Sequence, residues 1–164
     1  GSLGSDLRAC TAARMAAERW RVFLDTNVLI AGVLTQRGIP ATILDLGETE
    51  EVQLVVSRQV LVEADRVFAR KFPALLERYR LFIKNLRPLL VEDPPAHAVR
   101  EARKVIHPDD APILAAAKLA KVHYLVTGNT RHFTASRVRE FLSIPIVTPA
   151  EFLAAFRAFW ERAS

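Results

Sequence analysis

The chain has 164 residues, the size of one ordinary domain, and its 51% hydrophobic and 25% charged residues fit a folded globular protein rather than a disordered one. Its single cysteine, Cys10, excludes a disulfide framework and indicates a reducing, cytoplasmic location, and no apolar run is long enough to cross a bilayer, so we expect no membrane partner. The net charge of +5 and the pI near 9.9 favour a polyanionic partner, although an ordinary basic surface would have the same charge.

The first twenty residues stand apart from the rest of the chain. Residues 1–5 have the composition of a tag remnant, and residues 7–20 are rich in alanine and arginine and are predicted to be helical. We interpret residues 1–20 as this remnant followed by an N-terminal extension, and we assign them no function. Residues 21–160 contain no linker and no internal repeat, so they are predicted to form a single domain.

Strand-like and helix-like segments alternate along this domain. The predicted strands are short, apolar segments at residues 21–25, 52–56, 89–91, 122–127 and 144–147. The predicted helices lie at residues 27–34, 40–47, 58–71, 73–86, 96–105, 110–121 and from 149 onward. Such alternation predicts βαβ units and a central parallel sheet covered by helices on both faces, which is a three-layer α/β/α fold.

Acidic and polar residues stand beside the ends of the predicted strands. Asp25 ends the first strand, Asn129 follows the fourth, and Glu63 lies about two turns into the helix after the second strand. Asp109 and Asp110 stand at the start of the helix that precedes the fourth strand. Because ligands of open parallel sheets bind beyond the carboxyl ends of the strands, we expect these residues to converge on one edge of the sheet.

Most of these residues also have an ordinary structural explanation. Asp25 can serve as a helix N-cap, and Asp109 and Asp110 can cap the following helix and complement its dipole. Asn129 can be a simple turn residue. Each residue taken alone therefore leaves both explanations open.

Glu63 is the more informative position. It lies beside the apolar stripe of its helix, where a charge is costly unless it is paired or bound to a metal. A salt bridge to Arg66 or Arg70 would satisfy this requirement as well as a metal would. Carboxylates that crowd together raise one another's pKa unless a cation neutralises them, and clusters with oxygen ligands alone suit Mg²⁺ or Mn²⁺.

The order and placement of these motifs resemble the PIN domain. The matching segments are FLDTNVLI at residues 23–30, PDDAPIL at 108–114, LVTGN at 125–129 and IPIVTPAEFL at 144–153. Ser57 with Glu63, and His132 with Phe133, also match. The resemblance covers about residues 21–156 and is closest to the PIN proteins regarded as toxins of toxin–antitoxin pairs, which are VapC-like in the broad sense.

This resemblance implies a divalent metal site and hydrolysis of RNA phosphodiester bonds. Asp25, Glu63 and Asp110 match the acidic residues of the family and would be both catalytic residues and ligands of Mg²⁺ or Mn²⁺. Asp109 is a neighbour that can take part as a further ligand. Asn129 stands where many members have a fourth aspartate, so it would be a neutral or water-mediated ligand, and the departure removes one negative charge.

Further residues are expected to support the site or to contact the substrate. They are Asn27, Ser57, Thr127, Arg131 and His132. His132 can contact a phosphate or only cap a turn. Phe133 can stack on a base of single-stranded RNA, but we expect it to be a core residue.

The expected reaction is attack of a metal-activated water on the RNA backbone. The expected partners are RNA, single-stranded regions above all, an antitoxin protein and a second copy of the chain in a homodimer. Two alternatives remain open at this point. The chain can be an RNA-processing nuclease without an antitoxin, or a domain with a weakened site that only binds nucleic acid.

Overall fold

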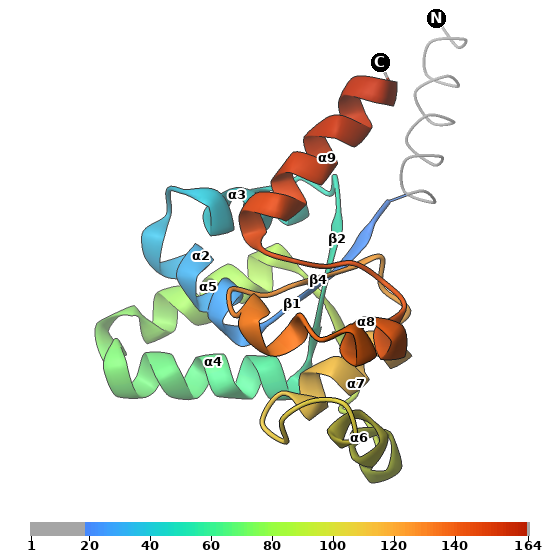
Figure 1. Ribbon diagram of the computed structural model, residues 1–164. Helices are drawn as coiled ribbons and strands as arrows, with labels where there is room; N and C mark the ends of the chain where they lie inside the picture. The colour runs from blue at the N-terminus through green and yellow to red at the C-terminus, as the bar shows by residue number, and fades with distance from the viewer. Residues whose placement is uncertain (1–18, 164) are drawn as a thin grey trace, which may run out of the picture.

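The computed structural model describes residues 19–163, in which five strands form one sheet (Figure 1). The strands are β1 (Arg21–Leu24), β2 (Gln53–Ser57), β3 (Leu89–Val91), β4 (Tyr124–Val126) and β5 (Ile146–Val147). Every neighbouring pair is parallel, and the order across the sheet is β3-β2-β1-β4-β5. Residues 1–18, and with them most of the predicted extension, lie outside the described residues.

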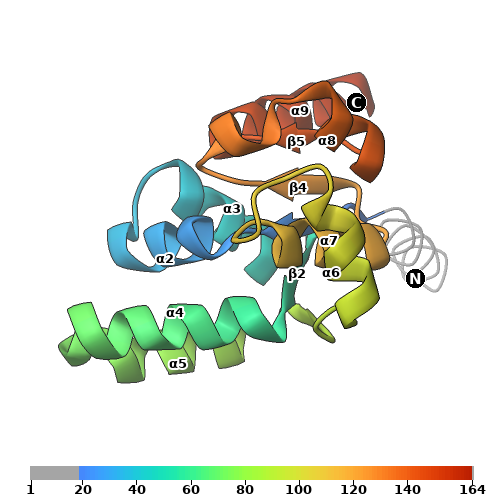
Figure 2. The ribbon, with the colours of Figure 1, turned by 60° about the horizontal axis from the view of Figure 1, so that its bottom comes forward.

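Helices cover both faces of the sheet. They are α2 (Thr26–Thr35), α3 (Ile39–Glu48), α4 (Arg58–Lys71), α5 (Leu76–Leu86), α6 (Ala96–Arg103), α7 (Ala111–Leu119), α8 (Ser136–Leu142) and α9 (Pro149–Ala163). Figure 2 shows α2 and α3 on one side of the strands and α6 and α7 on the other. The chain crosses the sheet in one direction from β1 through β2 to β3, and in the opposite direction from β3 to β4 and β5. Because crossovers between parallel strands are right-handed, the helices of these two parts lie on opposite faces. The predicted three-layer α/β/α fold is confirmed.

The predicted elements differ from the observed ones mainly at their ends. The segment predicted as one helix over residues 73–86 divides into the 3₁₀ turn η1 (Pro73–Leu75) and α5. Residues 130–143 carry no predicted helix, but the structure has the 3₁₀ turn η2 (Thr130–Phe133) and α8 there. Helix α8 has only 7 residues and buries two of them, so its apolar pattern is too short to stand out.

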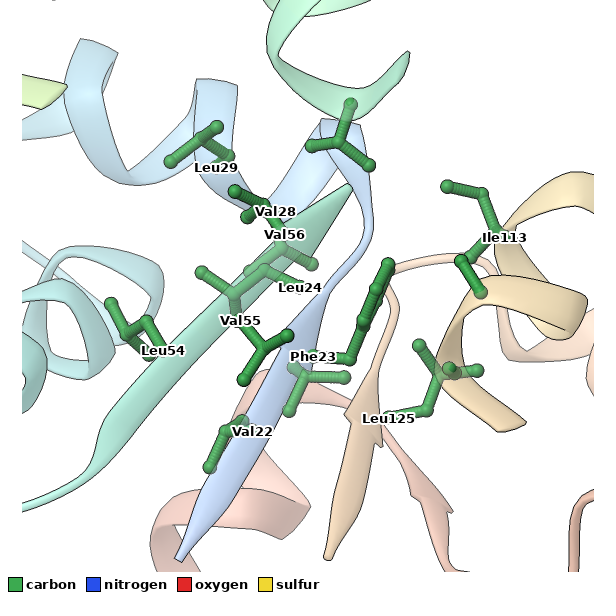
Figure 3. Packing of buried hydrophobic residues seen from close by; sticks show 14 of the residues in the cluster. Val22, Phe23, Leu24, Val28, Leu29, Leu54, Val55, Val56, Ile113 and Leu125 are labelled. Carbon is green, nitrogen blue, oxygen red and sulfur yellow. The ribbon is translucent and has the colours of Figure 1, made fainter. Parts of the chain in front are cut away.

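The buried core lies between the sheet and the two helix layers. Figure 3 shows the side chains of β1 with Leu29 of α2 on one side and Ile113 of α7 on the other. Phe133 is only 2% exposed, which confirms its prediction as a core residue. This core fixes both ends of β1 and β4, and the candidate site depends on their carboxyl ends.

Helices α2 and α3 are both apolar and follow one another through a short connection. Within residues 19–163, no single helix is long and apolar enough to span a membrane, and these two meet the length and composition test only as a pair bent by 94°.

Candidate active site

The candidate site lies where the sheet reverses its direction of winding. Strands β1 and β4 are neighbours, and their following connections run to opposite faces of the sheet. In open α/β sheets, ligands bind beyond the carboxyl ends of two such strands. Asp25 directly follows β1 and Thr127 directly follows β4. The Asp25 N–H donates to the Val126 carbonyl at 3.0 Å, so the two strand ends are joined at this point.

The Asp25 carboxylate is held by two hydrogen bonds. Its Oδ1 accepts from the Thr26 N–H at 2.7 Å, so Asp25 is the N-cap of α2, which is one of the two roles expected from the sequence. Its Oδ2 accepts from the Thr127 hydroxyl at 2.9 Å, and Thr127 is itself fully buried. Capping therefore uses one carboxylate oxygen, while the other joins the end of β4.

The electrostatic environment of Asp25 links it to two other acids. Burial is the largest cause of its change in pKa and raises the pKa above the ordinary value. The hydrogen bonds from Thr127 and Thr26 oppose this rise, and the negative charges of Asp110 and Glu63 add to it. The charges of Asp110 and Glu63 thus lie near enough to act on the Asp25 carboxylate.

Glu63 is oriented by neutral donors. The Thr26 hydroxyl donates to its Oε2 at 3.0 Å, and the Gln59 side-chain amide donates to its Oε1 at 3.0 Å. Among residues 19–163, neither Arg66 nor Arg70 forms an ion pair with Glu63, so the salt bridge considered from the sequence is absent. Its negative charge is therefore hydrogen-bonded but not neutralised.

Asp110 stands at the N-terminus of α7 but does not cap it. Its side chain makes no capping hydrogen bond, and its Oδ2 lies 2.8 Å from Nδ1 of His132. The Asn129 amide nitrogen lies 3.3 Å from the same Nδ1, and the Asn129 N–H donates to the Thr127 hydroxyl oxygen at 3.1 Å. These contacts bring Asp110, Asn129 and His132 together beside the end of β4.

The remaining predicted residues lie at varying distances from this group. Asp109 is 90% exposed, and its carboxylate faces His107 at 3.6 Å rather than the other acids. Ser57 is buried and caps α4, accepting from the Val60 N–H at 3.3 Å. Asn27 and Arg131 are exposed, and neither side chain makes a hydrogen bond or ion pair in the described part of the chain.

Sequence reasoning missed two supporting residues. Gln59 lies one helical turn before Glu63, and this i, i+4 spacing was the available signal for their contact. Asp93 accepts from the Gln59 N–H at 2.9 Å and so gives α4 a second capping group. Asp93 is 34 residues away in the sequence, so no local pattern indicated this contact.

The donor set fits a divalent cation by its chemistry. Asp25, Glu63 and Asp110 offer carboxylate oxygens, the preferred ligands of Mg²⁺ and Mn²⁺. Burial raises the pKa of Asp25, and the charges of Asp110 and Glu63 add to the rise. As the side chains stand, no three acidic, histidine or cysteine residues within 19–163 are grouped closely enough to enclose a metal ion. Binding would therefore require the carboxylates to turn towards a common point.

Comparisons with known proteins agree with this fold. A family profile described as PIN domain matches residues 21–131. The crystal structure of VapBC2 from Rickettsia felis, bound to a DNA fragment from their promoter, has a chain that matches with a TM-score of 0.59 and 18% identity, covering 78% of this chain and 98% of that one. DNA-bound VapBC from Salmonella typhimurium matches with a TM-score of 0.59 and 18% identity over 79% and 98%. FitAcB from Neisseria gonorrhoeae matches with a TM-score of 0.57 and 22% identity over 78% and 97%. No curated protein matches the sequence.

Proposed function

Because the chain belongs to the PIN domain family, we propose that it is a divalent-metal-dependent endoribonuclease and the toxin of a toxin–antitoxin pair. PIN domains are generally nucleases and generally use divalent metal ions. The observation that carries the proposal is the shared electrostatic environment of Asp25, Glu63 and Asp110 beyond the ends of β1 and β4. Partly buried carboxylates that lie together at a topological switch point are costly unless they serve a ligand.

Asp25, Glu63 and Asp110 are the residues that would hold Mg²⁺ or Mn²⁺, with Asn129 as a neutral oxygen donor. When bound, the cation supplies positive charge at the scissile phosphate and activates water for in-line attack. Asp109 would become a further ligand only if its exposed carboxylate turned away from His107.

The surrounding residues orient the carboxylates without cancelling their charge. Thr127 donates to Asp25, and Thr26 and Gln59 donate to the two oxygens of Glu63. These donors are neutral, so they restrict the rotation of the carboxylates but leave the negative charge available to a cation. An arginine in their place would form an ion pair that competes with the metal.

Two exposed cations support RNA as the substrate. Arg58 follows the end of β2 and Arg131 lies in η2 after β4, so they lie on either side of Asp25 in the strand order. Both are exposed, and neither forms an ion pair with another described residue. We propose that they contact phosphates of a single-stranded RNA backbone that crosses the acidic group.

The proposal of a toxin extends to partners. Similar folds include VapBC from two organisms, each in a structure that contains DNA, and FitAcB. By this likeness we propose an antitoxin partner. A homodimer and a cytoplasmic site of action are proposed from the sequence and its resemblance to VapC-like proteins alone. An RNA-processing role without an antitoxin would use the same catalytic residues, and a small antitoxin gene beside this one distinguishes the two roles.

The test is cleavage of mixed single-stranded RNAs by the purified full chain with Mn²⁺ or Mg²⁺, and again with EDTA. We expect metal-dependent cleavage that falls at least about 100-fold in Asp25→Asn, since this change removes one of the charges that attract the cation. The matched control is Asp45→Asn, because Asp45 is exposed on α3 and makes no side-chain contact with another described residue. Equal cleavage by both variants would contradict the proposal.

A second candidate function rests on Asn129 and on the open arrangement of the acids. In this case the domain binds RNA without cleaving it, because the group holds too little negative charge to bind a cation tightly. Salt-dependent RNA binding with no cleavage in either metal would support this second function over the first.

A further inference from the structure

We propose that His132 is a positioning residue that holds one oxygen of the Asp110 carboxylate and leaves the other free for a metal ion. The inference rests on the proposed metal site and goes beyond it, because it assigns His132 a role that is neither a phosphate contact nor a turn cap. The geometry behind it is the 2.8 Å contact between Nδ1 of His132 and Oδ2 of Asp110.

The Asp110 carboxylate has no other described partner. Although Asp110 is the N-cap residue of α7, its side chain makes no capping hydrogen bond. Its Oδ1 accepts no hydrogen bond from residues 19–163, and its side chain is only 22% exposed. Without His132, this partly buried carboxylate would have nothing to fix its orientation, and a carboxylate that rotates freely is a poorer ligand.

Nδ1 of His132 lies near both Asp110 and Asn129, and its hydrogen-bonding capacity identifies Asp110 as its partner. An ionised carboxylate only accepts, so Nδ1 of His132 carries the hydrogen and donates to Asp110. The same Nδ1 then cannot accept from the Asn129 amide, which lies farther away at 3.3 Å. The charged Asp110 carboxylate is the stronger acceptor for this hydrogen, because a hydrogen bond to an ionised group is stronger than one to a neutral amide.

The contact also joins two distant parts of the chain. Asp110 begins α7, and His132 lies in η2, which follows β4 and is 22 residues further along. Thr127, which directly follows β4, fixes the same loop by accepting from the Asn129 N–H. The position of Asp110 relative to Asp25 thus depends on a loop that β4 anchors, and His132 is the side chain that completes the connection.

The experiment measures Mn²⁺ binding to the full chain by calorimetry at one fixed pH, with the metal alone and no RNA. We expect His132→Ala to weaken Mn²⁺ binding about tenfold, the effect typical of losing a hydrogen bond to a ligating group. His132→Asn keeps an N–H donor near the position of Nδ1, so it should recover most of the affinity. The matched control is His97→Ala, because His97 is exposed on α6 and its side chain makes no hydrogen bond or ion pair with another described residue.

A double-mutant cycle separates positioning from a general structural effect. If His132 acts through Asp110, His132→Ala should have little further effect on Mn²⁺ binding once Asp110→Asn is present. The inference is overturned if His132→Ala binds Mn²⁺ as the wild type does, if His132→Asn is no better than His132→Ala, or if the loss persists in the Asp110→Asn background. Wild-type protein that binds no Mn²⁺ would overturn both this inference and the proposed metal site. Wild-type protein that binds Mn²⁺ but cleaves no RNA would overturn the nuclease proposal alone.

Discussion

Strands β1 and β4 have opposite chemistry at their two ends. At the amino ends, Trp20 precedes β1 and Tyr124 begins β4, and their rings lie 4.9 Å apart between centroids. Phe152 of α9 packs edge-on against both rings. At the carboxyl ends of the same strands, Asp25 and Thr127 share a hydrogen bond in a polar group. One end of the strand pair therefore contributes stability through packing, while the other holds buried charge at a cost in stability.

This difference indicates that stability and the candidate site depend on opposite ends of the same two strands. The aromatic end brings together Trp20, which precedes the predicted domain, with α9, which closes the chain, and it needs no particular chemistry beyond shape and area. The acidic end keeps unneutralised carboxylates, which only a ligand would make favourable. Substitutions at the first end should lower stability without changing the reaction, whereas removing a charged carboxylate at the second end should impair the reaction and raise stability.

The largest expected effect on stability is at the aromatic end. Phe152→Ala removes a fully buried ring that contacts Trp20, Tyr124 and Phe156, and we expect it to lower the free energy of unfolding by about 3–5 kcal/mol. Urea unfolding measures the loss. Phe159→Ala is the control, because this ring is 36% exposed and should cost much less. Equal losses would show that the cluster does not carry the stability.

A smaller effect on stability is expected at the carboxyl ends of the two strands. Thr127→Val keeps the shape of this buried side chain but removes the hydroxyl that donates to Asp25, so we expect a loss of about 1.5–3 kcal/mol at pH 7, measured by urea unfolding. Thr127→Ser restores the hydroxyl and should recover most of the loss. A serine variant as unstable as the valine variant would assign the effect to packing instead.

Asp25→Asn should act in the opposite direction in the absence of metal. Folding raises the pKa of Asp25, so the folded protein binds this proton more tightly than the unfolded chain does. The stability that protonated Asp25 contributes is therefore fully present below its ordinary pKa of 3.8. This contribution is lost as the pH rises through the raised pKa of the folded state. Thermal unfolding in EDTA should show Asp25→Asn melting above the wild type at pH 7. The gap should shrink as the pH falls towards 3.8, whereas a gap that is constant with pH would exclude this cause.

The smallest expected effects concern the exposed cations beside the acidic group. Arg58→Gln and Arg131→Gln should each weaken RNA binding a few-fold, with no change in melting temperature. Each change should also lower the slope of log affinity against log salt by about one or less, since each removes one phosphate contact. Filter binding at several salt concentrations measures both quantities. Arg157→Gln, at an exposed position of α9, which packs at the amino ends of the strands, should leave the slope unchanged.

The fold was predictable because its signals are local. Short apolar strands, the Ser57 cap and the capping box of Thr148 and Glu151, which make reciprocal hydrogen bonds of 3.0 and 3.1 Å, are each written within a few residues. Helix α8 was not predicted, because a 7-residue helix offers about one apolar repeat before it ends.

The members of the acidic group were predictable from strand ends and from the resemblance to PIN domains, but their connections were not. The contacts of Thr26 with Glu63 and of Asp110 with His132 span 37 and 22 residues. They depend on which strands become neighbours, and a sequence pattern carries no distance between such segments. Gln59 is the exception, because its partner Glu63 lies on the same helix.

The placement of β4 beside β1 has a consequence for the growing polypeptide. The two strands meet across 102 residues, counted from Asp25 to Thr127, because β2 and β3 are added on the other side of β1. A ribosome that has released residues 1–120 has produced all three acids, yet the edge of β1 that β4 occupies is still bare, and such non-local contacts form late. Asp110 meets His132 only after β4 has emerged and paired. The candidate site is therefore assembled only near the end of synthesis of the chain.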